Sequence, residues 1–381
     1  METITLTIFD ETLRDGEQQV GIFFDSKLKH DLAHLIAKTG IHHVALMPAI
    51  HHTEARLVKN LVHQGLKKSV AASTMMGKKY IDESLLCGVK TIILFNAVSD
   101  RLLWLRDAQY RDRAITPRII ERVREKMLNN VLKHLEYAAE EGLKICFAAE
   151  DASRADGDFL VECISKFQPY VDHFLLCDTV GILSPEFTKN WIRNLIDFTG
   201  NKTPLAVHFH NDRGLALENT IQAVLAGATG ISGTFGGIGE RAGNAALEQV
   251  LNGLKLRYGC EIAGINYEAL ADVTDYLTQH KIYANTPYSA ETLRYETGIH
   301  VDSLLRNHDT YYLFPDGEPE VWFGKFSGAS NFQYLFEKQL QKPLAKSKYQ
   351  EYREIIKNVA IAKKRSFSSS EVIQILKQLN Y

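Results

Sequence analysis

Two histidines, His208 and His210, are separated by one residue and follow the apolar run Leu205-Ala206-Val207. If this run is a β-strand, alternate side chains share a face, so the two imidazoles lie side by side at the end of the strand. Two imidazoles in this arrangement can bind one divalent metal ion. The simpler interpretation is that two polar residues close an apolar strand, so the choice depends on what the rest of the chain places beside them.

The elements that would position this pair alternate between short apolar runs and longer amphipathic segments up to about residue 260. Eight runs have the composition of buried strands, at residues 4–9, 41–47, 69–74, 91–95, 144–148, 173–177, 205–209 and 230–234. This alternation predicts parallel strands with right-handed crossovers, and eight such units predict an α/β fold, a (β/α)8 TIM barrel, over residues 1–262. A doubly wound sheet is the alternative, but it requires a glycine-rich turn after the first strand, where this chain has a charged loop.

In such a barrel, the chemistry takes place at the C-terminal ends of the strands. Polar residues follow five of the predicted strands, among them Arg14, Asp15, Gln18, Glu150, Asp178, Thr179 and Asn244. This clustering favours the metal interpretation of the histidine pair, with Asp15 as the carboxylate ligand and the amide oxygen of Asn244 as a further ligand. Arg14 can stabilise a developing oxyanion, and a salt bridge beneath the barrel mouth is its alternative role.

Composition and charge exclude several other classes of protein. The chain has 381 residues and a net charge of -2, which argues against a nucleic-acid or anionic-membrane surface. No stretch approaches the roughly 20 apolar residues that span a bilayer, and the N-terminus lacks the features of a signal peptide. The five scattered cysteines fit reduced thiols, so we expect a cytoplasmic protein.

Beyond residue 262 the alternation stops, and residues 263–381 are predicted to form C-terminal subdomains that contribute a lid and a dimerisation surface. Helices are expected at residues 267–280, 349–363 and 369–379. Ser368 stands three residues before Glu371, which is a capping-box pattern at the start of the last helix.

Several motifs in this order resemble the DRE-TIM metallolyase superfamily, and within it the homocitrate synthase and 2-isopropylmalate synthase group. They are FDETLRDGEQ at residues 9–18, CDTVG at 177–181, HFHND at 208–212, GERAGNAALE at 239–248, ETGIHVD at 296–302 and GKFSG at 324–328. The resemblance spans nearly the whole chain. It implies an acyltransferase that condenses acetyl-CoA, or a related acyl-CoA, with a 2-oxo acid in a Claisen-type reaction to give a 2-hydroxy diacid.

The resemblance also implies roles for individual residues. The divalent metal, Mg, Mn or Zn, would be held by Asp15, His208 and His210, with Asn244 nearby. The catalytic residues would be Arg14, Glu150, His300 and Tyr311, and the substrate contacts would include Gln18 and Thr179. In the family the segment that carries His300 reaches into the partner subunit's barrel, which implies a homodimer.

The chain departs from the family pattern in places that affect the substrate. The glutamate expected after the second strand is absent from Val44-Ala45-Leu46-Met47-Pro48, and Arg101 or Leu102 replaces a histidine after the fourth strand. An arginine there could pair with an acidic substrate tail, so Arg101 is expected to contact the substrate. Only two helices follow residue 342, so no leucine-sensing regulatory domain is expected, which favours a homocitrate-synthase-like or specialised synthase.

Two alternative functions remain open. The first is a metal-dependent C–C bond lyase like the hydroxymethylglutaryl-CoA lyases. By resemblance, those lyases carry a catalytic cysteine in the loop that corresponds to residues 236–244, and the absence of a cysteine here counts against this alternative. The second is a non-catalytic relative. The sequence does not identify the 2-oxo acid, the metal or the pathway.

Overall fold

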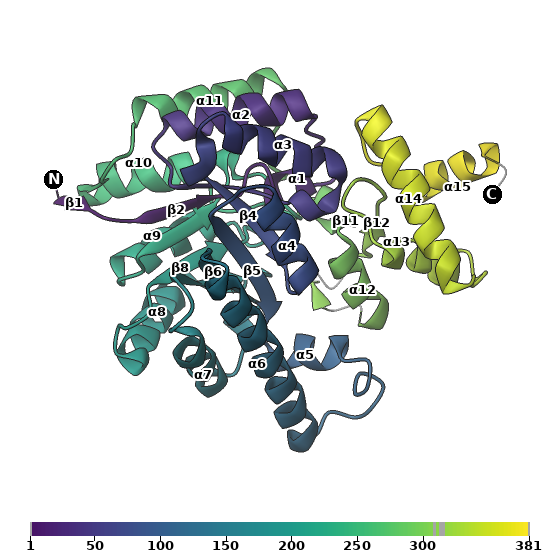
Figure 1. The fold of residues 1–381 in the computed structure, drawn as a ribbon, viewed down its shortest axis with the longest axis horizontal. Helices are drawn as coiled ribbons and strands as arrows, with labels where there is room; N and C mark the ends of the chain where they lie inside the picture. Colours follow the sequence, from purple (N-terminus) through teal and green to yellow (C-terminus); the bar gives the residue numbers. More distant parts are fainter. Residues whose placement is uncertain (1, 308–309, 312–316, 380–381) are drawn as a thin grey trace.

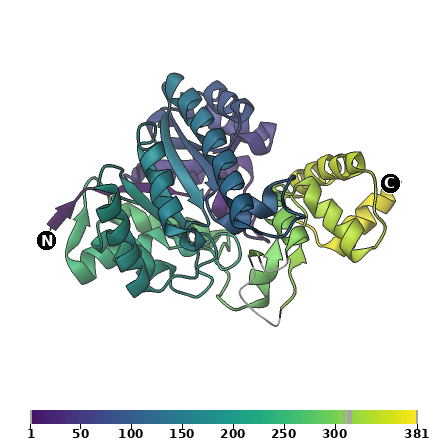
Figure 2. The ribbon, with the colours of Figure 1, turned by 90° about the horizontal axis from the view of Figure 1, so that it is seen from below.

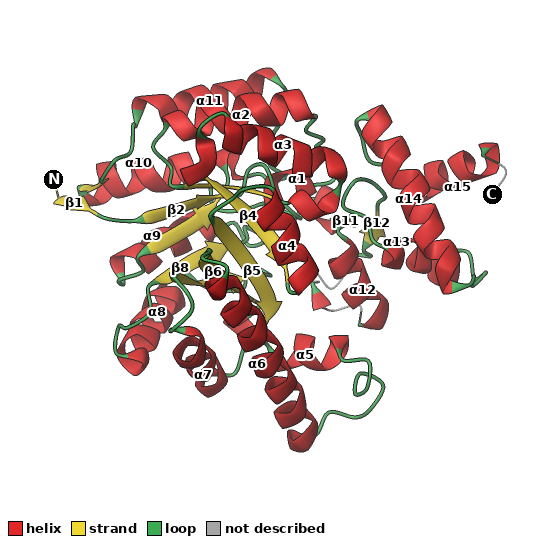
Figure 3. Ribbon diagram, viewed as in Figure 1, coloured by secondary structure: helices red, strands yellow, loops and turns green. Residues whose placement is uncertain are grey.

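The computed structural model describes residues 2–307, 310–311 and 317–379. Eight parallel strands close into a barrel in chain order, with helices packed around the outside (Figures 1 and 3), which confirms the predicted TIM barrel. The barrel strands are β2 (Thr7–Asp10), β3 (His43–Leu46), β4 (Val70–Met75), β5 (Thr91–Ala97), β6 (Lys144–Glu150), β7 (His173–Asp178), β8 (Leu205–Phe209) and β9 (Gly230–Gly233).

The helices around the barrel begin where the sequence supplies caps. The carboxylate of Asp25 accepts a hydrogen bond from the backbone N–H of Leu28 at 2.9 Å, and Ser184 caps a helix that starts with Pro185. The helices are α1 (Asp15–Gln18), α2 (Ser26–Lys38), α3 (His52–His63), α4 (Lys78–Leu86), α5 (Asp100–Arg106), α6 (Pro117–Glu140), α7 (Gly157–Phe167), α8 (Pro185–Thr199), α9 (Ala216–Leu225), α10 (Leu247–Tyr258) and α11 (Glu268–Gln279).

The first predicted strand, residues 4–9, is two strands in the structure. β1 (Glu2–Ile4) pairs in parallel with β10 (Cys260–Ile262) outside the barrel, whereas β2 joins β3 and β9 within it. Their burial differs accordingly, because the first two residues of β1 are exposed and the last three of β2 are buried.

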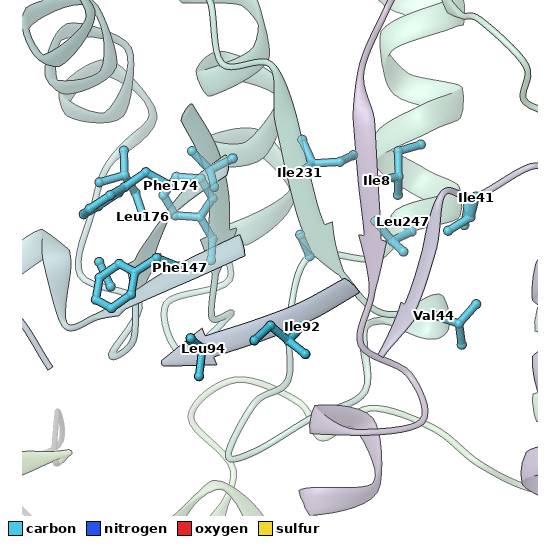
Figure 4. Close-up of a cluster of buried hydrophobic side chains, with 14 of the residues drawn as sticks. Ile8, Ile41, Val44, Ile92, Leu94, Phe147, Phe174, Leu176, Ile231 and Leu247 are labelled. Carbon is cyan, nitrogen blue, oxygen red and sulfur yellow. The ribbon is translucent and has the colours of Figure 1, made fainter. Parts of the chain in front are cut away.

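Side chains alternate along the barrel strands between two separate cores. Ile92 and Leu94 on β5, Phe147 on β6 and Leu176 on β7 lie in the large cluster between the barrel and its helices (Figure 4). Their sequence neighbours Ile93, Ala148 and Leu175, together with Cys177, form a smaller cluster inside the barrel. This period of two is the pattern expected of strands with both faces covered.

A second large core lies in the C-terminal part, beyond one side of the barrel (Figure 2). It contains Tyr295, Phe323, Phe332 and Ile356 and is built from β11 (Arg294–Tyr295), β12 (Glu320–Val321), α12 (Gly298–Arg306), α13 (Ala329–Gln333), a π-helix (Tyr334–Gln339), α14 (Lys346–Lys363) and α15 (Ser369–Gln378). The capping box at Ser368 and Glu371 is confirmed, because the backbone N–H of Ser368 donates to Glu371 Oε2 at 2.9 Å.

The predicted boundary after residue 262 precedes α11, whose Leu270, Val273 and Leu277 belong to the core around the barrel. None of the helices within the described residues is both long and apolar enough to cross a membrane.

Candidate active site

Asp15, His208 and His210 meet at the C-terminal end of the barrel. All three are buried, and one potential ligand atom from each lies within 4.8 Å of the others. The two Nε2 atoms of the histidines face each other at 3.3 Å, and each lies 3.8 Å from Asp15 Oδ2. Two facing nitrogen lone pairs and a carboxylate around one point form a donor set that suits a divalent cation.

The protonation states of these groups suit metal binding. Burial lowers the pKa of His208 to about 4 and that of His210 well below its ordinary value, so both imidazoles are neutral near pH 7. His208 Nδ1 lies 3.0 Å from Ser232 Oγ, and a proton shared there leaves Nε2 free to coordinate. Burial disfavours the charged form of Asp15, but Arg14 and the two imidazoles outweigh this and hold the pKa of its carboxyl below its usual range.

Asn244 joins the triad through a glycine turn. Its Nδ2 donates to Asp15 Oδ1 at 3.1 Å, while its buried Oδ1 has no hydrogen-bond partner within the described residues. Gly239 has φ +148°, and a Cβ there would collide with Asn244 Nδ2 and lie 2.7 Å from Asp15 Oδ1. Only glycine therefore allows this approach, and the orphaned amide oxygen is a further donor that an ion could satisfy.

Arg14 lies beside the triad with its charge already shared. Its Nε donates to Glu11 Oε2 at 2.6 Å, and its Nη1 lies 3.3 Å from Asp15 Oδ2. Nη1 also donates to Gln18 Oε1 at 3.4 Å. The salt bridge and the position beside the metal ligands occur together, so the two predicted roles of Arg14 do not exclude each other.

Glu150 is held by an arginine that the sequence did not single out. Arg106 on α5 donates to both carboxylate oxygens of Glu150, at 2.6 and 2.7 Å, and to the Tyr311 hydroxyl at 2.7 Å. Tyr311 in turn donates to Glu150 Oε1 at 2.9 Å. Burial opposes ionisation of Glu150, but the ion pair with Arg106 dominates and lowers the pKa of Glu150 to about 2.

Arg101, which was predicted to contact the substrate, lies on the same helix as Arg106. Its Nη2 donates to Asn307 Oδ1 at 3.1 Å, and it does not line the cavity. Arg106 stands five positions after Arg101 on this helix, which places the two side chains about 140° apart around the helix axis. The signal that could have identified Arg106 is its place at the last turn of the helix after the fourth strand.

His300 and Thr179 complete the mouth of the barrel. His300 is on α12, its ring lies 4.2 Å from that of Tyr311, and its Nδ1 lies 3.0 Å from Glu240 Oε1. Thr179 follows β7, and its Oγ1 accepts from the backbone N–H of Asp151 at 2.9 Å. His300 thus lines the cavity at the mouth of the barrel of the same chain.

A cavity of about 650 Å³ opens over these groups. Of the predicted site residues, it is lined by Arg14, Asp15, Gln18, Glu150, Thr179, His208, His210 and His300. Asn244 and Tyr311 lie behind its wall, in contact with Asp15 and Glu150 respectively. His51, which precedes α3, also lines the cavity.

A buried cluster of charges fixes the C-terminal part to the catalytic loop. Lys325, in the motif at 324–328, lies 2.9 Å from Glu17 and 2.6 Å from Glu54, and Lys29 lies 2.7 Å from each of the same carboxylates. The side chains are at most 4% exposed. Because Glu17 is two residues from Asp15, this cluster links the C-terminal part to the segment that carries a candidate metal ligand.

The chain is similar to several known proteins over most of its length. A sequence model of the HMGL-like family matches residues 5–277. The chain is 35% identical over 333 residues to homocitrate synthase AksA of Methanothermobacter thermautotrophicus, covering 85% of this chain and 81% of that one. It is 30% identical to 2-isopropylmalate synthase 2 of Caldanaerobacter subterraneus subsp. tengcongensis, covering 97% and 94%.

Among solved structures, hydroxymethylglutaryl-CoA lyase from Pseudomonas aeruginosa superposes with a TM-score of 0.57 at 20% identity, covering 77% of this chain and 97% of that one, which supports the fold. The extent of the family match, together with the motifs that form the site, identifies the chain as a member of the HMGL-like family within the DRE-TIM metallolyase superfamily.

Proposed function

We propose that this protein is an acyltransferase that condenses acetyl-CoA, or a related acyl-CoA, with a 2-oxo acid to form a 2-hydroxy diacid. The observation that carries the proposal is the buried triad of Asp15, His208 and His210 beside Arg14, at the edge of a cavity of about 650 Å³. The names of the relatives, homocitrate synthase and 2-isopropylmalate synthase, support the same reaction class.

The triad, with Asn244, would hold a divalent ion, which when bound would polarise the oxo group of the 2-oxo acid. Arg14 would stabilise negative charge on that oxygen, because its Nη1 lies beside the metal ligand Asp15. Thr179 and Gln18, which line the same cavity, would orient the carboxylate of the substrate.

Proton transfer would fall to Glu150, Tyr311 and His300. The acyl methyl must lose a proton before its carbon can attack the oxo carbon, and the thioester is then hydrolysed to release CoA and a carboxylate. Glu150 is ionised at neutral pH and can accept a proton, whereas burial and the adjacent Glu150 raise the pKa of Tyr311 well above its usual value and keep its hydroxyl protonated. His300, in ring contact with Tyr311, is placed to pass protons between this pair and the cavity.

Thiol release from acetyl-CoA across a panel of 2-oxo acids, with and without Mg²⁺, Mn²⁺ or Zn²⁺, tests this proposal. We expect metal-dependent release with at least one 2-oxo acid, and release that falls at least about 100-fold in Arg14→Gln, because an electrostatic stabiliser of the oxyanion is lost. Metal-loaded protein that releases no CoA from any 2-oxo acid would refute the proposal. Cleavage of a 3-hydroxyacyl-CoA without condensation would favour the lyase instead.

Homodimer formation remains a prediction from the family resemblance. The segment that carries His300 is the one that the resemblance assigns to the interface between subunits. Sedimentation measured alongside the activity would separate assembly from catalysis.

A further inference from the structure

The wall of the cavity below the triad is made by the inner faces of the barrel strands. Ile93 and Phe95 on β5, Ala148 on β6, and Leu175 and Cys177 on β7 all line the cavity. Four of them belong to the apolar cluster inside the barrel, and Phe95 packs against it. They alternate along the strands with the outward-facing residues of Figure 4, so their side chains share the inner face of the barrel.

This apolar wall begins one strand away from the metal ligands. Cys177 is paired in register with His208, Leu175 with Ala148, and Ala148 with Phe95. If the oxo group of a 2-oxo acid lies at the triad, the side chain of the acid, opposite its carboxylate, lies against this wall.

Four guanidinium groups around the barrel mouth are paired with carboxylates of the same chain. The pairs are Arg14 with Glu11, Arg106 with Glu150, Arg154 with Asp151, and Arg241 with Asp212, at 2.6 to 2.8 Å. Of these four arginines, only Arg14 lines the cavity. The wall residues themselves carry no charge, so a second carboxylate placed against them would have no cation to receive it.

Other cations do line the cavity, but they come from helices outside the barrel strands. Lys79 is on α4, and Arg353 and Lys357 are on α14, which stands beyond the barrel in Figure 1. Arg353 pairs with Glu354 on its own helix, and Lys357 donates to the backbone carbonyl of Ile50 at 3.3 Å. These three cations are carried by helices, whereas the five residues of the strand wall carry no charge.

We infer that the 2-oxo acid carries an uncharged, apolar side chain rather than a second carboxylate. The inference rests on the proposed function and specifies its substrate class. A carboxylate on the wall would lose its hydration without gaining a partner, whereas a branched alkyl group of the same shape would replace water on apolar surface. The sequence had suggested Arg101 as a partner for an acidic substrate tail, but Arg101 is not among the residues that line the cavity.

Two pairs of substrates of matched shape test the inference. Oxaloacetate is paired with 4-methyl-2-oxopentanoate, and 2-oxoglutarate with 5-methyl-2-oxohexanoate. In each pair the second acid carries an isopropyl group where the first carries its second carboxylate. We expect kcat/KM for CoA release to favour the branched member of a pair by about 100-fold or more. Calorimetric binding of the same acids to the full chain with Mn²⁺ measures the preference without turnover.

Phe95 offers a matched pair of variants, since it is half-buried at the cavity. Phe95→Arg should shift the ratio toward the dicarboxylate at least about 10-fold, because it adds a cation to the wall, and Phe95→Leu should keep the branched preference. If Phe95→Arg fails to fold, the wild-type ratios still decide the question.

A wild-type preference for the dicarboxylates, or equal use of both members, would overturn the inference and leave the proposed function intact. Loss of such a preference in Lys357→Met would then place the acidic tail at α14. If no acid binds and no CoA is released, the proposed function fails and the inference fails with it.

Discussion

Replacement of Arg106 with glutamine should expose how strongly Glu150 depends on one cation. Arg106 makes two hydrogen-bonded contacts with a carboxylate whose side chain is only 13% exposed. Removing one partner of a buried ion pair costs about 3–5 kcal/mol. The pKa of Glu150, held at about 2 against an ordinary value of 4.5, corresponds to about 3 kcal/mol by the usual conversion, which agrees.

The pH dependence has a definite sign. In the wild type the pKa of Glu150 is depressed on folding, so its ion pair stabilises the fold above about pH 4.5 and loses this effect as the pH falls toward 2. In Arg106→Gln the ion pair that lowers the pKa of Glu150 is lost while burial still raises it, so the pKa of Glu150 should rise. The loss in free energy of unfolding should therefore be about 3 kcal/mol at pH 7 and clearly smaller at pH 4, as measured by urea denaturation.

Catalysis supplies a second measurement and α5 supplies the control. If ionised Glu150 accepts a proton, the acidic limb of the kcat/KM profile for CoA release should move to higher pH in Arg106→Gln. Arg101→Gln removes the same charge from the same helix and, among the described residues, loses only the hydrogen bond to Asn307, so its stability should change by less than about 1 kcal/mol. Equal losses in the two variants, or a loss in Arg106→Gln that does not vary with pH, would refute the reasoning.

Three further predictions concern the triad, the buried charges and the cavity rim. His208→Ala should bind at least about 10-fold less divalent metal after dialysis, as measured by elemental analysis, and stoichiometric retention would contradict its assignment as a ligand. Lys325→Met should lower the free energy of unfolding, measured in urea, by about 3–5 kcal/mol, because Lys29 would be left as the buried lysine paired with Glu17 and Glu54. A loss below about 1 kcal/mol would argue that this cluster does not stabilise the contact between the C-terminal part and the barrel. Burial lowers the pKa of Lys357 to about 8, so its ammonium form destabilises the fold below that pH, and this penalty disappears as the pH rises toward 10.5. Lys357→Met should therefore be more stable than the wild type by up to about 3 kcal/mol at pH 7 and should lose this advantage at pH 10.5. A gain in stability that does not vary with pH would contradict burial of the charge as its cause.

Much of this protein could be predicted from local patterns in the chain. Eight apolar runs at regular spacing determine a closed parallel barrel, because strands covered on both faces and joined by helices pack in few other ways. His208 and His210 share a face because alternate residues of a strand point the same way. Asp15 lies near them because the parallel strands of the barrel all end on the same side. The capping box at Ser368 is likewise local, since its two partners are three residues apart.

Tertiary structure decided the contacts that join distant parts of the chain. Whether Arg101 or Arg106 serves Glu150 depends on the rotation of α5 against β6 and on the arrival of Tyr311 from 161 residues away along the sequence. The cluster at Lys325 joins residues 308 apart, and no periodicity records such a pairing. The inference about the substrate depends on which side chains of three strands face inward and on the ion pairs of Arg14, Arg106, Arg154 and Arg241. The sequence by itself therefore determined the reaction class, and only the folded barrel bears on the side chain of the substrate.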